Sequence, residues 1–328
     1  MKKTLFAIFM IFSLFILSGC DDTNTGVGPS TTPFVGGTNA LSLSFMEGAP
    51  PSEVFDNGDY TFGINIKIEN LGEDDVETQD GYLEITGIDA QEFGLNGQSD
   101  LIIDIPYDIK GVNKNSEGTI FVSEPIIAEF GELNYEGDSR GNFDYRIRAT
   151  ACYNYETEAT TLACLKRDML TNIDTKEVCS LNGDKEVYNS GGPIQVTKVT
   201  QTPVGSDKIQ LTFEISHVGE VNDRFYKLDT DCDDRATNQN KDLVYFEVLD
   251  TEGNSLGDAQ CTGLKKGSQD SEGYIELFSG APRTVVCTFD TSNVEGIFEK
   301  KVNVKISYRY SQFIEKTIIV KDVSSKDD

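Results

Sequence analysis

Residues Phe143–Lys166, FDYRIRATACYNYETEATTLACLK, align without gaps to residues Phe298–Lys321, FEKKVNVKISYRYSQFIEKTIIVK. Each segment starts with basic residues that alternate with apolar or small ones, passes through Tyr-x-Tyr, and ends in an apolar run closed by Lys. Alternation with period two is typical of a half-buried strand. We therefore expect each segment to form a strand, a short turn and a second strand, so that the same hairpin closes each half of the chain.

The repeated tyrosines occupy equivalent positions, Tyr153 and Tyr155 in the first copy and Tyr308 and Tyr310 in the second. Residues two apart on a strand point to the same side, so each pair could form a stacking face for sugars. The chain contains no Trp, the residue that commonly serves as a sugar platform. Repetition at equivalent places favours a packing role in the closing hairpin.

A shorter match lies upstream, where Ile64–Glu73, INIKIENLGE, resembles Leu211–Glu220, LTFEISHVGE. Short alternating runs separated by turn signals such as Asn57-Gly58 continue through the chain, which is the pattern of β-sandwiches. We predict an all-β fold of two tandem Ig-like β-sandwich domains, residues 41–180 and 190–322, with a disordered tail at 323–328.

The composition favours a folded, acidic protein. Of the 328 residues, 38% are hydrophobic, and 19 Phe and 13 Tyr are enough to fill two small cores. The formal net charge is −27, and it becomes −29 if Lys2 and Lys3 are removed with a signal peptide. Such a surface repels nucleic acid and anionic headgroups and attracts cations or basic partners. No nucleic-acid partner is expected.

The first twenty residues, MKKTLFAIFMIFSLFILSGC, form a basic start, an apolar run and a small-residue end. The run Thr4–Leu17 is shorter than the roughly 20 residues that a spanning helix needs. Leu17-Ser18-Gly19-Cys20 resembles the lipobox of bacterial and some archaeal lipoproteins. The resemblance implies a signal peptide at 1–19, a diacylglyceryl group on Cys20, and a membrane-anchored, extracytoplasmic location. An ordinary secretory signal and an uncleaved anchor are the alternatives.

Residues Asp21–Ala40 are rich in Gly, Thr, Asn and Pro. This composition predicts a flexible tether over residues 20–40, with a root-mean-square reach of roughly 25 Å. The tether would lift the folded part clear of the membrane surface.

Six cysteines remain beyond Cys20, an even number in an exported chain: Cys152, Cys164, Cys179, Cys232, Cys261 and Cys287. They predict up to three disulfides, for which fifteen connectivities exist. A hairpin at Phe143–Lys166 would place Cys152 opposite Cys164, and Cys261–Cys287 and Cys179–Cys232 would complete the set. The wide spacings argue against zinc.

Three alternate aspartates, Asp229, Asp231 and Asp233, lie in the stretch DTDCDD. Calcium loops begin in this way, but they then require Gly at the sixth position and Glu at the twelfth. Asp234 and Asn240 occupy those positions. The pattern therefore predicts at most a weak calcium site, against a solvated acidic loop as the alternative. No other cofactor is expected.

The strand ending in Asn70-Leu71-Gly72 resembles the Ig-like modules of the CARDB type found in archaeal and bacterial surface proteins. The stretch ACYNYETEATTLAC, followed by SGGPIQVTKV and HVGE, is similar to uncharacterised secreted proteins of small-genome archaea. The likeness covers most of residues 41–321 and implies fold and surface location, not activity. His217 departs from the pattern, which prefers Asn at that position.

Catalytic signals are weak. His217 is the only histidine, and it lies at a strand end where a capping role is expected. The chain has no G-x-S-x-G, P-loop or Rossmann glycine series. We expect a non-catalytic, lipid-anchored protein for surface binding, adhesion or structural display, whose partners are other surface proteins or envelope polymers. A solute- or carbohydrate-binding lipoprotein serving a membrane machine is the alternative, and an acid-pair hydrolase using carboxylates such as Asp74 and Asp75 is a third.

Overall fold

The computed structural model describes residues 32–58, 60–169, 178–235, 237–253, 259–265 and 270–323. Over these residues the chain forms strands and three 3₁₀ turns, η1 Thr78–Asp80, η2 Gln98–Leu101 and η3 Phe278–Gly280, and no α-helix. The predicted all-β fold is confirmed. No helix in this part of the chain is long and apolar enough to span a membrane. The predicted signal peptide, Cys20 and residues 324–328 lie outside the described residues.

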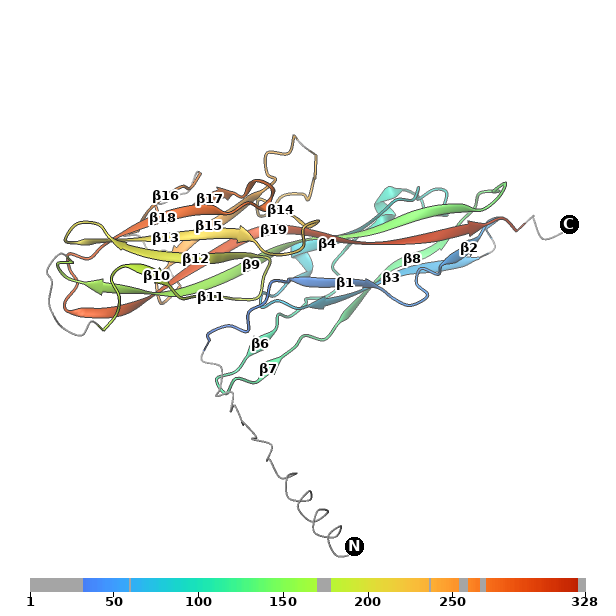
Figure 1. Cartoon of the computed structure of the whole chain (residues 1–328). Helices are drawn as coiled ribbons and strands as arrows, with labels where there is room; N and C mark the ends of the chain where they lie inside the picture. Colours follow the sequence, from blue (N-terminus) through green and yellow to red (C-terminus); the bar gives the residue numbers. More distant parts are fainter. Residues whose placement is uncertain are drawn as a thin grey trace, which may run out of the picture. The chain divides into compact units, whose positions relative to one another are not determined.

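The two repeated segments are single long strands, β9 (Phe143–Lys166) and β19 (Ile297–Lys321). They pair antiparallel from one end to the other, as Figure 1 shows in green and red. The predicted hairpins are therefore wrong. Residues 156–158, where the first turn was expected, continue the alternation, and Thr157 is fully buried inside the strand. Glu-Thr-Glu supplies none of the Gly, Pro or Asn residues that favour a turn, so the strand continues.

The pairing of the long strands is two-fold symmetric. The repeated tyrosines face one another across the two strands, Tyr153 opposite Tyr310 and Tyr155 opposite Tyr308. The sequence repeat equates Tyr153 with Tyr308 instead, so a local two-fold axis passes between Asn154 and Arg309, which are also opposite each other. All four tyrosine rings are at most 1% exposed, and neighbouring ring centroids lie 6.0–6.1 Å apart. The structure shows the predicted packing role, but in the middle of the two paired long strands instead of in a hairpin.

The long strands lie at the centre of the largest sheet, which has the order β17-β15-β19-β9-β4-β5. Its other main strands are β17 (Glu272–Glu276), β15 (Leu243–Leu249), β4 (Gly81–Thr86) and β5 (Ile102–Asp104). Three short strands pair with the long ones, β2 (Glu53–Phe55), β11 (Val187–Asn189) and β14 (Arg224–Tyr226).

Two further sheets follow the same plan in the two repeats. The first has the order β1-β3-β8, with bounds Leu41–Phe45, Thr61–Asn70 and Ile126–Asn134. The second has the order β10-β12-β13-β18-β16, with bounds Gly183–Lys185, Ile194–Pro203, Lys208–His217, Arg283–Asp290 and Gln260–Thr262. A separate hairpin is formed by β6 (Asn113–Lys114) and β7 (Ile120–Phe121). Because β1-β3-β8 and β12-β13-β18 have matching order and register, the repeat extends beyond the long strands.

Within each repeat, the neighbouring strand pairs with only part of the long strand. In the first repeat, β4 pairs with the first half of β9, and in the second repeat β15 pairs with the first half of β19. The second half of β19 runs back beside the first half of β9, where β2 of the first repeat pairs with it. Each long strand is therefore shared between the two repeats.

The alternating apolar residues identified in the sequence form the buried core. In β3 every second residue from Phe62 to Asn70 is buried, which is the pattern of a strand with one face on a core. The buried apolar residues of both repeats form one continuous cluster. Packing between sheets is direct at Phe213 of β13 and Phe246 of β15, whose ring centroids are 5.8 Å apart.

Part of the predicted tether is packed against this core. Among residues 32–40, Ala40 is 2% exposed, and the carbonyl oxygen of Gly37 accepts a hydrogen bond from the amide of Gly192. The composition of the segment predicts flexibility, but its backbone amides and carbonyls find partners in the body of the protein. The expectation of a tether extending to residue 40 is therefore wrong.

The structure contains three disulfides, Cys152–Cys232, Cys164–Cys179 and Cys261–Cys287. The expected Cys261–Cys287 pair is confirmed, and these residues are opposite each other on β16 and β18. The expected Cys152–Cys164 and Cys179–Cys232 pairs are wrong, because there is no hairpin. Cys152 and Cys164 lie on the same strand, and 12 residues of extended chain separate them by roughly 40 Å.

We expect the contact between Gly72 and Tyr155 to tolerate no side chain. A Cβ atom on Gly72 would overlap the Tyr155 hydroxyl and lie 2.7 Å from the carbonyl oxygens of Asn39 and Gly191. Gly72→Ala should therefore lower the free energy of unfolding by about 2–3 kcal/mol in urea denaturation. The matched control is Gly131→Ala in β8, where a Cβ meets no atom within 4 Å. Equal midpoints for the two variants would contradict this account of the packing.

Candidate functional site

An acidic site lies beside the four packed tyrosines, where the turn that follows β3 contacts β9. The turn brings Asp74 against the long strand. The amide of Asp74 donates to the Tyr155 hydroxyl at 3.3 Å, and the amide of Glu156 donates to Asp74 Oδ2 at 2.7 Å. Glu158 follows two residues later on the same strand, so its side chain leaves β9 on the same side as that of Glu156. We call Asp74, Glu156 and Glu158 the acidic site.

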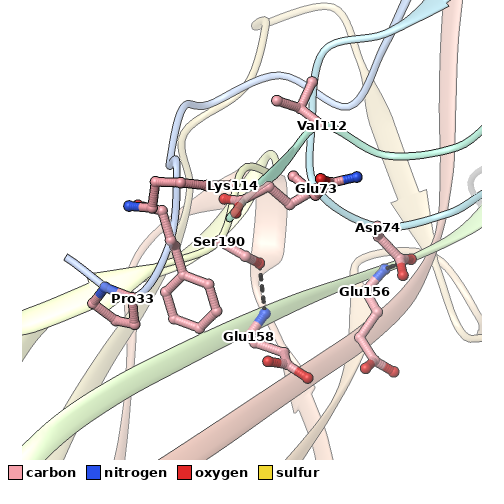
Figure 2. A pocket seen from close by; sticks show the side chains of 10 residues that line it. Pro33, Glu73, Asp74, Val112, Lys114, Glu156, Glu158 and Ser190 are labelled. Carbon is pink, nitrogen blue, oxygen red and sulfur yellow. Dashed lines mark hydrogen bonds between the residues drawn. The ribbon is translucent and has the colours of Figure 1, made fainter. Parts of the chain in front are cut away.

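Two open cavities, of about 300 and 330 Å³, flank the acidic site, and Asp74 and Glu156 line both. Figure 2 shows the first cavity, in which Asp74, Glu156 and Glu158 lie in a row. The remaining residues that line this cavity are Pro33, Phe34, Glu73, Val112, Asn113, Lys114 and Ser190. The second cavity is lined by further acids, Asp75, Glu77 and Asp80. The surface around Asp74 is therefore strongly negative.

Two charged side chains of the first cavity hold the N-terminal segment. Glu73 accepts hydrogen bonds from the amides of Val35, Gly36 and Gly191 at 2.7–2.9 Å. Lys114 donates through Nζ to the carbonyl oxygens of Thr32 and Phe34 at 2.7 and 2.8 Å. Charged groups in such bonds form strong hydrogen bonds. Glu73 and Lys114 therefore serve the fold, and they fix residues 32–36 at the rim of the cavity.

The acidic site keeps an excess of negative charge. Glu156 Oε2 lies 3.0 Å from Lys305 Nζ and accepts from Ser307 Oγ at 3.0 Å. Lys305 lies opposite Glu158 in the strand register but forms its ion pair with Glu156. Burial first, and then the neighbouring Glu156, raise the pKa of Asp74 to about 7. A cation placed beside Asp74 would relieve this repulsion.

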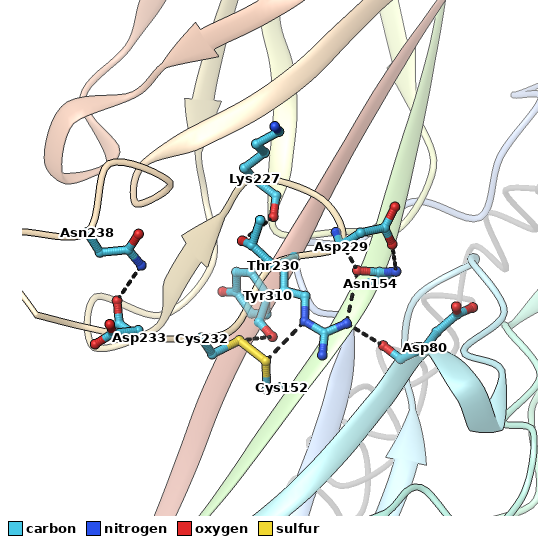
Figure 3. Close-up of a disulfide and its surroundings, with 11 residues drawn as sticks. Asp80, Cys152, Asn154, Lys227, Asp229, Thr230, Cys232, Asp233, Asn238 and Tyr310 are labelled. Carbon is cyan, nitrogen blue, oxygen red and sulfur yellow. Dashed lines mark hydrogen bonds between the residues drawn. A yellow bond between two sulfur atoms is a disulfide. The ribbon is translucent and has the colours of Figure 1, made fainter.

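The structure does not bring Asp229, Asp231 and Asp233 of the predicted calcium site together around one point. Within the described ranges, no group of three or more His, Cys, Asp or Glu side chains is arranged to hold a metal ion. Asp229 accepts from Asn154 Nδ2 at 2.8 Å, and Asp233 accepts from Arg235 Nε at 2.7 Å. Asp231 is exposed. The Cys152–Cys232 disulfide ties this loop to β9 (Figure 3), so the carboxylates face separate partners instead of converging.

Arg309 is a residue that the sequence did not single out. It lies between the two second-copy tyrosines, at the local two-fold axis. Its Nε lies 3.2 Å from Cys152 Sγ, and its Nη1 donates to the Asp80 carbonyl oxygen and to Asn154 Oδ1. The only signal that could have indicated these contacts is an arginine inside a buried strand.

His217 takes a structural place. Its Nε2 lies 2.9 Å from the Tyr310 hydroxyl, which donates to Asp223 Oδ2 at 2.8 Å. Burial, with a contribution from Arg224, lowers the pKa of His217 to about 4, so the ring is neutral near pH 7. Asn70 holds the equivalent position in the first repeat and caps its own turn by accepting from the Gly72 amide. His217 instead secures the turn through the tyrosine.

No family model matches the chain. No curated protein matches it either. The resemblance to CARDB-type modules therefore stays a prediction.

We expect Asp74 to make stability fall as the pH rises. The unfolded chain releases this proton near pH 3.8, while the folded protein keeps it to about pH 7. Between these values the folded state binds more protons, so the free energy of unfolding decreases with increasing pH. Asp74→Asn should remove about 3 kcal/mol of this decrease between pH 4 and 7, measured by urea denaturation. His217 acts in the opposite direction and is unchanged in both proteins. Asp138→Asn, at an exposed aspartate, is the control; an unaltered slope in Asp74→Asn would contradict the assignment.

Proposed function

We propose that this is a lipid-anchored, extracytoplasmic protein that binds other molecules at the cell surface and does not transform them. Three features support the proposal. The lipobox-like Leu17-Ser18-Gly19-Cys20 supplies an anchor, and the three disulfides suit an oxidising compartment outside the cytoplasm. The bonds of Glu73 and Lys114 to residues 32–36 fix the point at which the chain enters the folded body.

The acidic site is our candidate for the contact with a partner. We propose that it receives a cationic group, the ammonium or guanidinium of a basic protein or peptide. The observation that carries this proposal is the position of Asp74 between two open cavities, where burial first, and then the like charge of Glu156, raise the pKa of its carboxyl group to about 7. A bound cation would lower the pKa of Asp74, so binding would release a proton.

The cavity dimensions bear on the alternative of a solute- or carbohydrate-binding lipoprotein. Cavities of about 300 Å³ are at the small end of ligand pockets, which are usually lined mainly by apolar and aromatic side chains. Here the lining is dominated by carboxylates. A small cationic solute fits this chemistry better than a neutral sugar, and a basic side chain on a larger partner fits it best.

We expect the acidic site to bind a labelled tetralysine peptide in a pH-dependent way. Asp74→Asn/Glu158→Gln should weaken binding about tenfold, because it removes two carboxylates from one cavity. The control, Asp138→Asn/Glu132→Gln, makes the same change in net charge at exposed residues elsewhere. Affinity for the native protein should rise between pH 6 and pH 8 as Asp74 ionises. Equal losses in both double variants, measured by fluorescence anisotropy at fixed ionic strength, would show that only the overall charge attracts the peptide.

We expect Cys20 to determine where the protein is found. The native protein should partition with membranes, be accessible to protease on intact cells, and show a diacylglyceryl mass on Cys20. Cys20→Ala should remove the lipid and shift the protein out of the lipid-anchored membrane fraction, with the three disulfides preserved. A native chain recovered in the cytoplasm with free thiols would refute the proposed location.

A further inference from the structure

The β6–β7 hairpin exposes a run of apolar side chains. Ile120, Phe121 and Val122 are 51%, 50% and 77% exposed, and they are consecutive in the chain. Single exposed apolar residues are ordinary on protein surfaces, but three large ones together on one hairpin can form a contact surface. Apolar strands at an edge also invite aggregation unless they are covered.

The tip of this hairpin is well ordered. Asn115 closes the turn, because its backbone amide donates to the Thr119 carbonyl oxygen at 3.0 Å and its Oδ1 accepts from the amides of Glu117 and Thr119. The apolar run is therefore presented on a closed turn instead of a loose loop. A preorganised surface loses little conformational freedom on binding.

The hairpin also marks the place where the chain leaves the folded body towards its N-terminus. Lys114 of β6 holds the carbonyl oxygens of Thr32 and Phe34. Eleven residues separate Thr32 from Cys20. Fully extended, they reach roughly 40 Å, and as a flexible chain their root-mean-square reach is roughly 20 Å. A lipid on Cys20 would therefore keep the hairpin close to the membrane.

We propose that Ile120, Phe121 and Val122 insert into the membrane interface to which Cys20 is anchored, and so form a second attachment point. The inference rests on the proposed lipid anchor. Short tethering raises the effective concentration of the membrane at the hairpin, so a contact too weak to hold the protein alone becomes populated. The two acyl chains of the diacylglyceryl group hold the protein at the membrane, and the hairpin contact would fix its orientation there. The exposed residues Glu117 and Glu124 flank the run, so the favoured surface is zwitterionic, not anionic.

The absence of Trp from the sequence makes the test direct. Phe121→Trp introduces a single indole into the full, lipidated chain, which is reconstituted on phosphatidylcholine vesicles with and without brominated acyl chains. We expect a blue-shifted emission and about twofold quenching by the brominated lipid. Phe278→Trp is the matched control, because Phe278 is 63% exposed but belongs to the second repeat. Its emission should be unaffected by bromine. Replacing a third of the lipid by phosphatidylglycerol should weaken the quenching of Trp at position 121.

The outcomes separate the inference from the proposal on which it rests. An intact mass without lipid on Cys20 overturns both. A lipidated, vesicle-bound chain in which the indole at position 121 is quenched no more than that at 278 overturns the hairpin contact alone. A blue shift that grows with protein concentration in the absence of vesicles assigns the surface to a second copy of the chain, and also overturns it.

Discussion

The antiparallel pairing of β9 with β19 is the interaction on which the other features depend. It joins the two repeats through one ladder of backbone hydrogen bonds, and at its centre four tyrosine rings are packed where the repeats meet. Their hydroxyls also form hydrogen bonds. Tyr153 donates to Gln312 Oε1 and Tyr155 donates to the Gly191 carbonyl oxygen. Buried polar groups that are satisfied in this way make one register of the two strands much better than any other.

The acidic site is a consequence of the packing of these tyrosines. The Tyr155 hydroxyl lies against Gly72 and accepts from the Asp74 amide, so it determines how closely the end of β3 approaches β9. The same approach places the Asp74 carboxylate beside the Glu156 amide. The position is partly buried, so the charged carboxylate is less well solvated there than in water. The second repeat builds a related contact from Gly219, Tyr310 and His217, but there the tyrosine hydroxyl donates a hydrogen bond to Asp223. The same contact between a glycine and a tyrosine therefore lies beside different polar groups in the two repeats.

Sequence patterns were informative where the physics is local. Period-two alternation in segments such as Ile64–Glu73 predicted strands and hence the all-β fold, and the ungapped repeat predicted that the two halves of the chain are built from equivalent strands. The hairpins at Phe143–Lys166 and Phe298–Lys321 were wrong because an open strand and a hairpin bury the same alternating residues when no turn residue separates them. The disulfide partners of Cys152 and Cys164 depended on that choice. The acidic site could not be predicted, because 55 carboxylates are indistinguishable until the fold brings three together.

The pairing of β9 with β19 has a consequence for the biogenesis of the chain. Synthesis from the N-terminus delivers β9 long before β19, yet the two strands pair with each other over almost their whole lengths. Until the last residues are made, the edge of β9 that β19 covers has no partner. Contacts between such distant segments also form slowly. The chain therefore reaches its native state only after synthesis ends, and one edge of its central strand stays open until then.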